Sequence, residues 1–253
     1  MSLAGALIGF DVAPEHRATI TSALDFAGGV SGEDAAMWYR EVPHGDGRRF
    51  VRDDPVRDPG PVPIGRSVER VLEDVHLSIA LHARDEVFVH AGVVGWKGRA
   101  VVLPGRSGAG KSTLVEALVR AGATYCSDEY ARVRADGMIV PFPRPIRLRT
   151  GAGRRELDPR TIGLVGTEVL PPSLVLFTRY TDGAALVPEE VPPATAALEL
   201  FDHIVVAELS PGRATAAAAQ VARQTTAVRT LRPDAVETAP FVLDLAERVE
   251  VAA

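Results

Sequence analysis

The residues whose types and spacing most clearly suggest chemistry lie in one run, Gly105 to Ser112, which reads GRSGAGKS. The run has the spacing of a phosphate-binding loop, in which glycines let backbone N–H groups turn inward at a helix start. In such a loop the lysine supplies positive charge to the outer phosphates of a nucleotide, and the serine hydroxyl binds Mg²⁺. The residues of the predicted nucleotide site are Gly105, Arg106, Ser107, Gly108, Ala109, Gly110, Lys111, Ser112 and Thr113.

An acidic pair, Asp128 and Glu129, follows soon after this loop. Asp128 lies 17 positions after Lys111, so the pair is expected on the first strand beyond the loop's helix. At a strand end the two side chains point to opposite sides unless the chain turns there. One carboxylate can then face a substrate hydroxyl as a general base while the other faces a metal ion. Phosphoryl transfer to an alcohol needs both groups. Without the loop upstream, an exposed acidic turn would be the better interpretation.

His90 ends the apolar run EVFVH, ahead of the loop. A single histidine on a strand is more often a packed residue. If its strand lies beside the strand that enters the loop, His90 can approach Asp128 and orient it or tune its pKa.

The segment PFPRPIRLRTGAGRR carries several arginines, of which Arg147 and Arg149 are candidates for contacting phosphate or substrate. A transferred phosphoryl group needs positive charge opposite it, and arginine binds phosphate bidentately. A solvated basic loop is the competing interpretation.

The elements that must position these residues alternate between strands and helices. A strand over 100–103 leads into the loop, a helix over 113–121 follows it, and Gly122 ends that helix. Two β-branched runs around Trp96-Lys97-Gly98 predict a hairpin, and 172–180 predicts a strand buried on both faces. Three further helices, with a strand at TAVRTLRP, complete an α/β fold with a mixed sheet.

The first 66 residues are predicted to form an N-terminal extension or a small β-containing subdomain, ahead of a P-loop domain over 67–253. Residues 14–29 suggest a short helix ending at Gly28 and Gly29. The Pro-, Gly- and charge-rich stretch 43–65 predicts a long loop or junction. Ser67 is the expected N-cap of an amphipathic helix over 68–83.

Composition excludes several classes of protein. The net charge of −5 and the absence of a basic balance argue against a general nucleic-acid partner. No apolar run reaches the roughly 18 residues of a membrane helix, so no membrane is expected. A single cysteine, Cys126, rules out an intrachain disulfide and suits a reducing compartment. No basic, apolar leader is apparent, and a cytoplasmic protein is expected.

His90-Ala91-Gly92, the hairpin, GRSGAGKS and the segment ATYCSDEYARV together resemble the HPr kinase/phosphorylase family, and most closely its short bacterial relatives. The resemblance covers about 67–150 well, and 170–250 by element order alone. It implies a P-loop kinase core of the HPr kinase and phosphoenolpyruvate carboxykinase type, with a mixed β-sheet flanked by helices. Some related short kinases phosphorylate a serine of a precursor peptide in natural-product biosynthesis.

The resemblance also implies roles for single residues. Asp128 matches the family's first acidic residue, the base for the acceptor hydroxyl, and His90 matches the histidine beside it. Glu129 stands where the family usually has Asp. Glu129 and Ser112 are the expected metal ligands. Lys111 carries over directly, whereas Thr113 replaces an acidic residue and the N-terminal 66 residues are too short for the family's regulatory domain.

The sequence therefore predicts an ATP- and Mg²⁺-dependent kinase that transfers a phosphoryl group to a hydroxyl, mainly a serine of a peptide or small protein. Two alternatives remain open: a kinase of a free sugar, amino acid or nucleoside, and a non-catalytic nucleotide-binding regulator. HPr kinases form hexamers, so the resemblance leaves a homo-oligomer open.

Overall fold

A computed structural model describes residues 2–3, 6–23, 35, 37–45, 47–54, 58–106, 108–150 and 153–249. Contacts divide the chain into two compact units, Met1–Asp85 and Glu86–Ala253. The helix after Ser67, which sequence analysis assigned to the P-loop domain, lies in the first unit.

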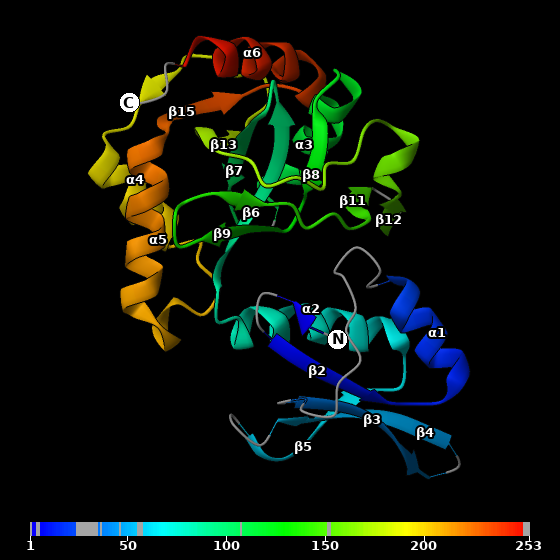
Figure 1. The fold of residues 1–253 in the computed structure, drawn as a ribbon. Helices are drawn as coiled ribbons and strands as arrows, with labels where there is room; N and C mark the ends of the chain where they lie inside the picture. Colours follow the sequence, from blue (N-terminus) through cyan, green and yellow to red (C-terminus); the bar gives the residue numbers. More distant parts are fainter. Residues whose placement is uncertain are drawn as a thin grey trace. The chain divides into compact units, whose positions relative to one another are not determined.

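The N-terminal unit is a mixed sheet with helices α1 and α2 (Figure 1). Strands β2 and β3, which are separated in the sequence by α1, pair parallel with each other. The other neighbouring strands pair antiparallel. The elements are β1 (Ser2–Leu3), β2 (Ala6–Asp11), α1 (Pro14–Ala23), β3 (Met37–His44), β4 (Gly47–Asp54), β5 (Asp58–Gly65) and α2 (Val68–His82). The predicted stop of the first helix at Gly28 and Gly29 lies outside the described residues.

The prediction of a long loop over 43–65 was wrong, because most of this stretch forms β4 and β5. Phe50 and Val51 are buried and hold β4 in the core of the unit. Three of the prolines, Pro59, Pro61 and Pro63, lie on β5, at one end of the strand order β1-β2-β3-β4-β5, where a missing N–H is tolerated. Because of these prolines and charges, the sequence pattern did not indicate strands β4 and β5. The helix prediction was confirmed: the Ser67 hydroxyl accepts a hydrogen bond from the Arg70 amide.

The second unit is built on a larger mixed sheet with helices on both faces. Its strand order is β10-β9-β6-β7-β13-β15-β14, with β8 also paired to β6. Its strands are β6 (Glu86–Trp96), β7 (Arg99–Pro104), β8 (Thr124–Ser127), β9 (Tyr130–Arg134), β10 (Ile139–Val140), β13 (Pro172–Tyr180), β14 (Glu189–Glu190) and β15 (Thr226–Arg232). Strands β11 (Ile146–Thr150) and β12 (Gly153–Leu157) pair with each other in a separate two-stranded sheet. The α-helices are α3 (Lys111–Arg120), α4 (Pro193–Phe201), α5 (Pro211–Gln224) and α6 (Ala235–Arg248).

Strand β13 is central and pairs parallel with both β7 and β15. Its first six residues are buried, which confirms the prediction of a strand covered on both faces. The predicted hairpin was also confirmed, since β6 and β7 pair antiparallel around Lys97 and Gly98. The α/β class and the mixed sheet are therefore as the sequence predicted.

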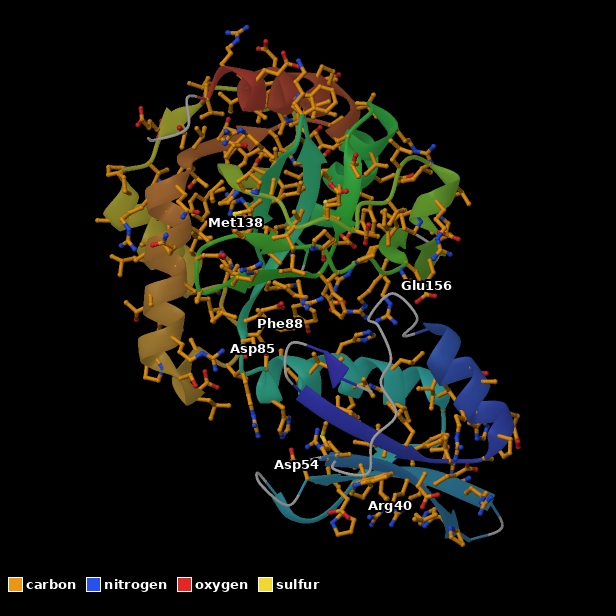
Figure 2. All side chains as sticks on the ribbon, viewed as in Figure 1. Arg40, Asp54, Asp85, Phe88, Met138 and Glu156 are labelled. Carbon is orange, nitrogen blue, oxygen red and sulfur yellow. The ribbon has the colours of Figure 1, made fainter. Side chains whose placement is uncertain are left out.

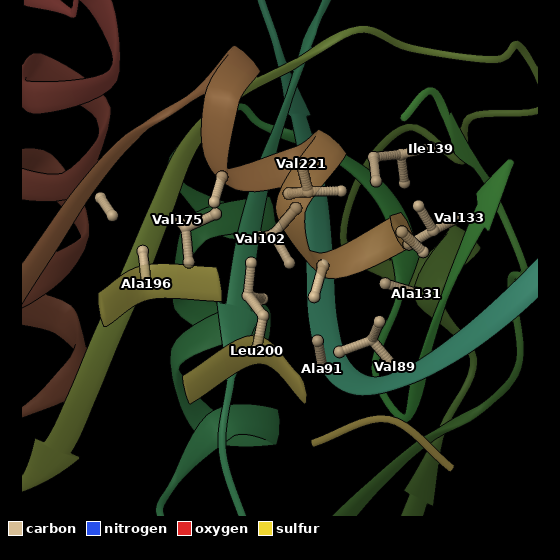
Figure 3. Packing of buried hydrophobic residues seen from close by; sticks show 14 of the residues in the cluster. Val89, Ala91, Val102, Ala131, Val133, Ile139, Val175, Ala196, Leu200 and Val221 are labelled. Atoms are coloured by element: carbon tan, nitrogen blue, oxygen red, sulfur yellow. The ribbon is translucent and has the colours of Figure 1, made fainter. Parts of the chain in front are cut away.

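The two faces of this sheet carry different helices. Helices α4 and α5 cover one face, where Leu200 and Val221 pack against strand residues such as Val102 and Val175 (Figure 3). Helices α3 and α6 cover the other face through Leu114, Val242 and their neighbours. Along β6, residues 89, 91 and 93 belong to the first core and residue 94 to the second. Because side chains alternate along a strand, His90 and Gly92 face the α3 side.

None of the described helices combines the length and the apolar composition needed to cross a membrane.

Candidate functional site

The glycine loop, defined as residues 105–110, connects the end of β7 to the start of α3. Gly108 and Gly110 have φ of 89° and 83°, a conformation that other residues adopt only with strain. The Gly105 amide donates to the His90 carbonyl at 3.3 Å, which ties the loop entrance to β6. Ser107, one predicted member of the nucleotide site, lies outside the described residues.

Helix α3 begins directly after the loop and has no side-chain hydrogen bond at its N-cap, Gly110. Lys111, Ser112 and Thr113 form its first turn, whose amides have no partner within the helix. No acidic side chain lies in that turn. A helix start of this kind favours an anion, because its amides point outward and its dipole is positive there.

Lys111 folds back over the glycine loop. Its ammonium donates to the carbonyls of Gly105 at 2.6 Å and Arg106 at 3.1 Å. Burial lowers the pKa of Lys111, while the charges of Asp128 and Glu129 act in the opposite direction. The ammonium is therefore held over the loop.

Asp128 lies in the short connection between β8 and β9, both of which pair antiparallel with β6. The Tyr130–His90 and Ser127–Val93 pairs share one register, and the Ala91 amide donates to the Glu129 carbonyl at 3.2 Å, so Asp128 lies next to Gly92. A Cβ on Gly92 would lie 2.6 Å from Cγ2 of Val115 on α3. The missing side chain thus lets β6 lie close to α3, and Asp128 shares that face.

The Asp128 carboxylate is buried, at 8% exposure, and its Oδ1 has no hydrogen-bond partner in the described structure. Burial raises its pKa to about 6. Hydrogen bonds from the Ser112 side chain and the Arg147 backbone, and the charge of Lys111, act to lower the pKa. Asp128 is thus the carboxylate that the fold brings to the first turn of α3.

Glu129 points elsewhere and forms an ion pair with Arg144, whose Nη1 lies 2.9 Å from Oε2. Arg144 is itself nearly buried. The adjacent carboxylates therefore have different surroundings, and the one beside Ser112 is Asp128. The metal role predicted for Glu129 stays a prediction.

His90 on β6 and Tyr130 on β9 are a cross-strand pair, with their ring centroids 6.3 Å apart. Burial and the charges of Lys111 and His203 together lower the pKa of His90 to about 4, and the charge of Glu129 opposes the shift. Asp128 is not among the described groups that shift this pKa. The predicted support of Asp128 by His90 therefore stays a prediction.

The two candidate arginines lie on β11, where Ile146 and Leu148 point into the core. Arg147 pairs with Glu156, labelled in Figure 2, at 3.0 Å between Nε and Oε1. The Arg149 side chain is exposed, and its Nη1 lies 3.8 Å from the position that a Cβ on Gly108 would take. Arg149 therefore reaches the glycine loop, whereas Arg147 contributes its backbone to Asp128.

His203 was missed by sequence analysis. It follows α4, and its carbonyl accepts a hydrogen bond of 2.7 Å from the His90 amide. Burial lowers its pKa, and the charges of Lys111 and Arg106 lower it further. The pairing of residues 203–205 with β6 brings His203 to the loop. Because these segments are far apart in the sequence, no local motif marks His203.

No family model matches the chain, and no curated protein matches it. Among solved structures, the chain is similar to the HPr(Ser) kinase/phosphatase from Coxiella burnetii. The identity is 14%, the TM-score is 0.37, and the match covers 63% of this chain and 93% of that chain. This is the family that the sequence motifs resemble. At that identity and TM-score, the likeness assigns neither a substrate nor a catalytic residue to this chain.

Proposed function

We propose that the chain is a kinase that transfers the outer phosphoryl group of a nucleoside triphosphate, ATP or a related purine nucleotide, to a hydroxyl. The observation that carries the proposal is the Asp128 carboxylate, which is buried with one oxygen unpartnered beside the start of α3. A buried carboxylate oxygen without a partner costs free energy, and such a group fits a site that a ligand completes. The glycine loop supplies a fitting ligand position next to it.

The residues present fit a nucleotide with Mg²⁺. The loop amides and the first turn of α3 would hold the phosphates, with Lys111 moving from its loop carbonyls to the outer phosphates. Ser112 and one oxygen of Asp128 would hold Mg²⁺, which neutralises charge on the phosphates. Arg149 stands beside Gly108 and adds positive charge at the loop.

Asp128 has two candidate roles in this reaction. A pKa near 6 suits a general base at neutral pH, because the group is then ionised and still basic enough to take a proton. Its contact with Ser112 suits a metal ligand instead. Among the acidic pair, Asp128 carries both roles better than Glu129, whose carboxylate is paired with Arg144.

The acceptor we propose is a serine hydroxyl in a peptide or small protein, a proposal that rests on the resemblance of the motifs. A free small-molecule hydroxyl is the competing acceptor. Incubation with γ-labelled ATP and Mg²⁺, using a panel of serine peptides and a panel of sugars, amino acids and nucleosides, separates the two. Binding of ATP without transfer to any acceptor would instead favour a nucleotide-binding regulator.

The roles of Asp128 separate in a magnesium titration of Asp128→Asn. A lost metal ligand raises the Mg²⁺ concentration needed for half-maximal rate, and excess Mg²⁺ restores part of the rate. A lost base lowers kcat at every Mg²⁺ concentration. Normal transfer by this variant at all Mg²⁺ concentrations would contradict both roles, and normal ATP binding by Lys111→Met would contradict the nucleotide site itself.

A further inference from the structure

The segment after α4 forms a short antiparallel continuation of the sheet against β6. The Val205 amide donates to the carbonyl of Phe88, labelled in Figure 2, at 2.8 Å, and Val89 bridges to Ile204. Strand β7 pairs with β6 only from Ala91 onward, so residues 203–205 pair with β6 where β7 has ended. The segment therefore lies next to the point where the chain leaves β7 for the glycine loop.

This pairing fixes which side of the sheet His203 faces. His203 stands opposite His90, and cross-strand neighbours project to the same face. That face is the α3 side, which also carries Gly92 and Asp128. Ile204, the next residue, packs with the core under α4 and α5, as alternation requires. His203 and His90 thus form one row on the face from which Lys111 begins α3.

The surroundings of His203 are positively charged on the loop side. Lys111 and Arg106 both lower its pKa, as does burial, while Asp202 and Glu199 oppose them. The imidazole is therefore neutral at pH 7 and presents one N–H donor and one acceptor. Such a group can bind a phosphate oxygen without placing a further positive charge beside Lys111 and Arg106.

The turn that carries His203 ends in a strained residue. Val206 has φ of 55°, a conformation that is rare for a β-branched side chain. The Leu209 amide donates to the Val206 carbonyl at 3.0 Å and closes the turn. Strain of this kind persists only where the surrounding contacts hold it, and it often marks functional segments.

From this juxtaposition we infer that His203 contacts the outermost phosphate of the nucleoside triphosphate held by the glycine loop, and so selects a triphosphate over a diphosphate. This inference rests on the proposed nucleotide site. The loop and the first turn of α3 hold the inner phosphates through backbone groups, which every nucleotide can use. His203 lies on the Lys111 side of the sheet, where an outer phosphate lies in such loops.

The test measures binding of Mg-ATP and Mg-ADP to the full chain by titration calorimetry. For His203→Ala we expect affinity for ATP to fall about tenfold or more, since a hydrogen bond to a charged group is lost. Affinity for ADP should change less than twofold. His203→Gln keeps an N–H donor and should restore most of the ATP affinity. The matched control His44→Ala, at an exposed histidine of the first unit, should leave both affinities unchanged.

Equal losses for ATP and ADP, or no loss for either, would overturn the inference, provided that circular dichroism shows the variant folded. Lys111→Met separates this result from a failure of the proposed function. If Lys111→Met loses both nucleotides while His203→Ala binds normally, the nucleotide site stands and the role of His203 is wrong. If Lys111→Met binds both nucleotides normally, the site itself is wrong, and the inference with it.

A second variant tests the turn rather than the histidine. Val206→Gly relieves the strain at positive φ but adds backbone freedom at the end of the turn. His203 is then held less firmly, so ATP affinity should fall severalfold while thermal stability is kept. Lys97→Gly is the matched control, because Lys97 also has positive φ but lies in the β6–β7 hairpin. Unchanged ATP affinity in Val206→Gly, or an equal loss in Lys97→Gly, would count against the positioning role of the turn.

Discussion

Two aspartates, Asp74 in the N-terminal unit and Asp128 in the second, show opposite ways to place a carboxylate inside a fold. Asp74 accepts a hydrogen bond of 2.6 Å from the Tyr39 hydroxyl and bonds of 2.9 Å to both oxygens from Arg52. Asp128 is more buried, yet its Oδ1 has no hydrogen-bond partner in the described structure. The chain itself completes the surroundings of Asp74, whereas one oxygen of Asp128 has no partner among the described residues.

This difference separates stability from function. A carboxylate paired with a guanidinium and a hydroxyl holds β3, β4 and α2 together, and removing it leaves its partners unpaired. A carboxylate with an unpartnered oxygen and a raised pKa costs the fold free energy, and groups of this kind cluster at functional sites. The two sites should therefore respond oppositely to equivalent substitutions.

The largest expected effect is loss of phosphoryl transfer in Asp128→Asn. The amide keeps the shape of the side chain but can neither take a proton nor hold Mg²⁺ with a negative charge. We expect kcat to fall by about 10²–10⁴-fold, with a melting temperature equal to or above that of the unmodified chain. Asp136→Asn, at an exposed aspartate of the same unit, is the control and should be fully active.

Asp74→Ala should show the reverse pattern. Arg52 and Tyr39 lose a shared partner, so the free energy of unfolding of the N-terminal unit should fall by about 2–3 kcal/mol. Urea unfolding measures this loss, and activity per folded molecule should remain. Asp53→Ala is the control, because its partly exposed ion pair with Arg40 should contribute less than about 1 kcal/mol. Equal losses from the two variants would remove the contrast between a buried network and a surface pair.

The pH dependence of stability should measure the free-energy cost of burying the Asp128 carboxylate. Its pKa in the folded chain, about 6, lies above the ordinary value of 3.8, so the folded state holds this proton more tightly than the unfolded state does. Relative to Asp128→Asn, the unmodified chain should therefore lose stability as pH rises from about 4 to about 6, and no further above that.

The change should be on the order of 3 kcal/mol, at about 1.4 kcal/mol for each pKa unit of the shift. Urea unfolding of both proteins at several pH values between 4 and 7 measures it. Taking the difference between the two proteins cancels the contribution of other groups, His90 included. A difference that does not depend on pH would mean that Asp128 is not desolvated.

The smallest expected effect is that of Tyr39→Phe, which removes one hydrogen bond to Asp74 and leaves Arg52 in place. The unfolding free energy should fall by about 1 kcal/mol. Tyr180→Phe is the control, since the Tyr180 hydroxyl makes only a long, exposed contact of 3.5 Å with Asp182. A loss in Tyr39→Phe as large as that in Asp74→Ala would show that the tyrosine, rather than the ion pair, stabilises this network.

Much of the second unit could be predicted from local pattern. The glycine loop, the hairpin at Lys97 and Gly98, and the buried strand 172–180 each carry a short-range signal in residue type and spacing. The strands within 43–65 could not be predicted, because prolines and charges on an edge strand mask the alternation that marks a strand. Their formation depends on neighbours that bury Phe50 and Val51.

The sequence by itself determined the glycine loop that can hold phosphate, the lysine and serine directly after it, and the acidic pair further along. All of these depend on spacing along the chain. Only the tertiary structure decided which carboxylate lies beside Ser112, that Glu129 is paired with Arg144, and that His203 stands opposite His90. Those outcomes depend on strand register and on contacts between residues far apart in sequence, which local spacing does not encode.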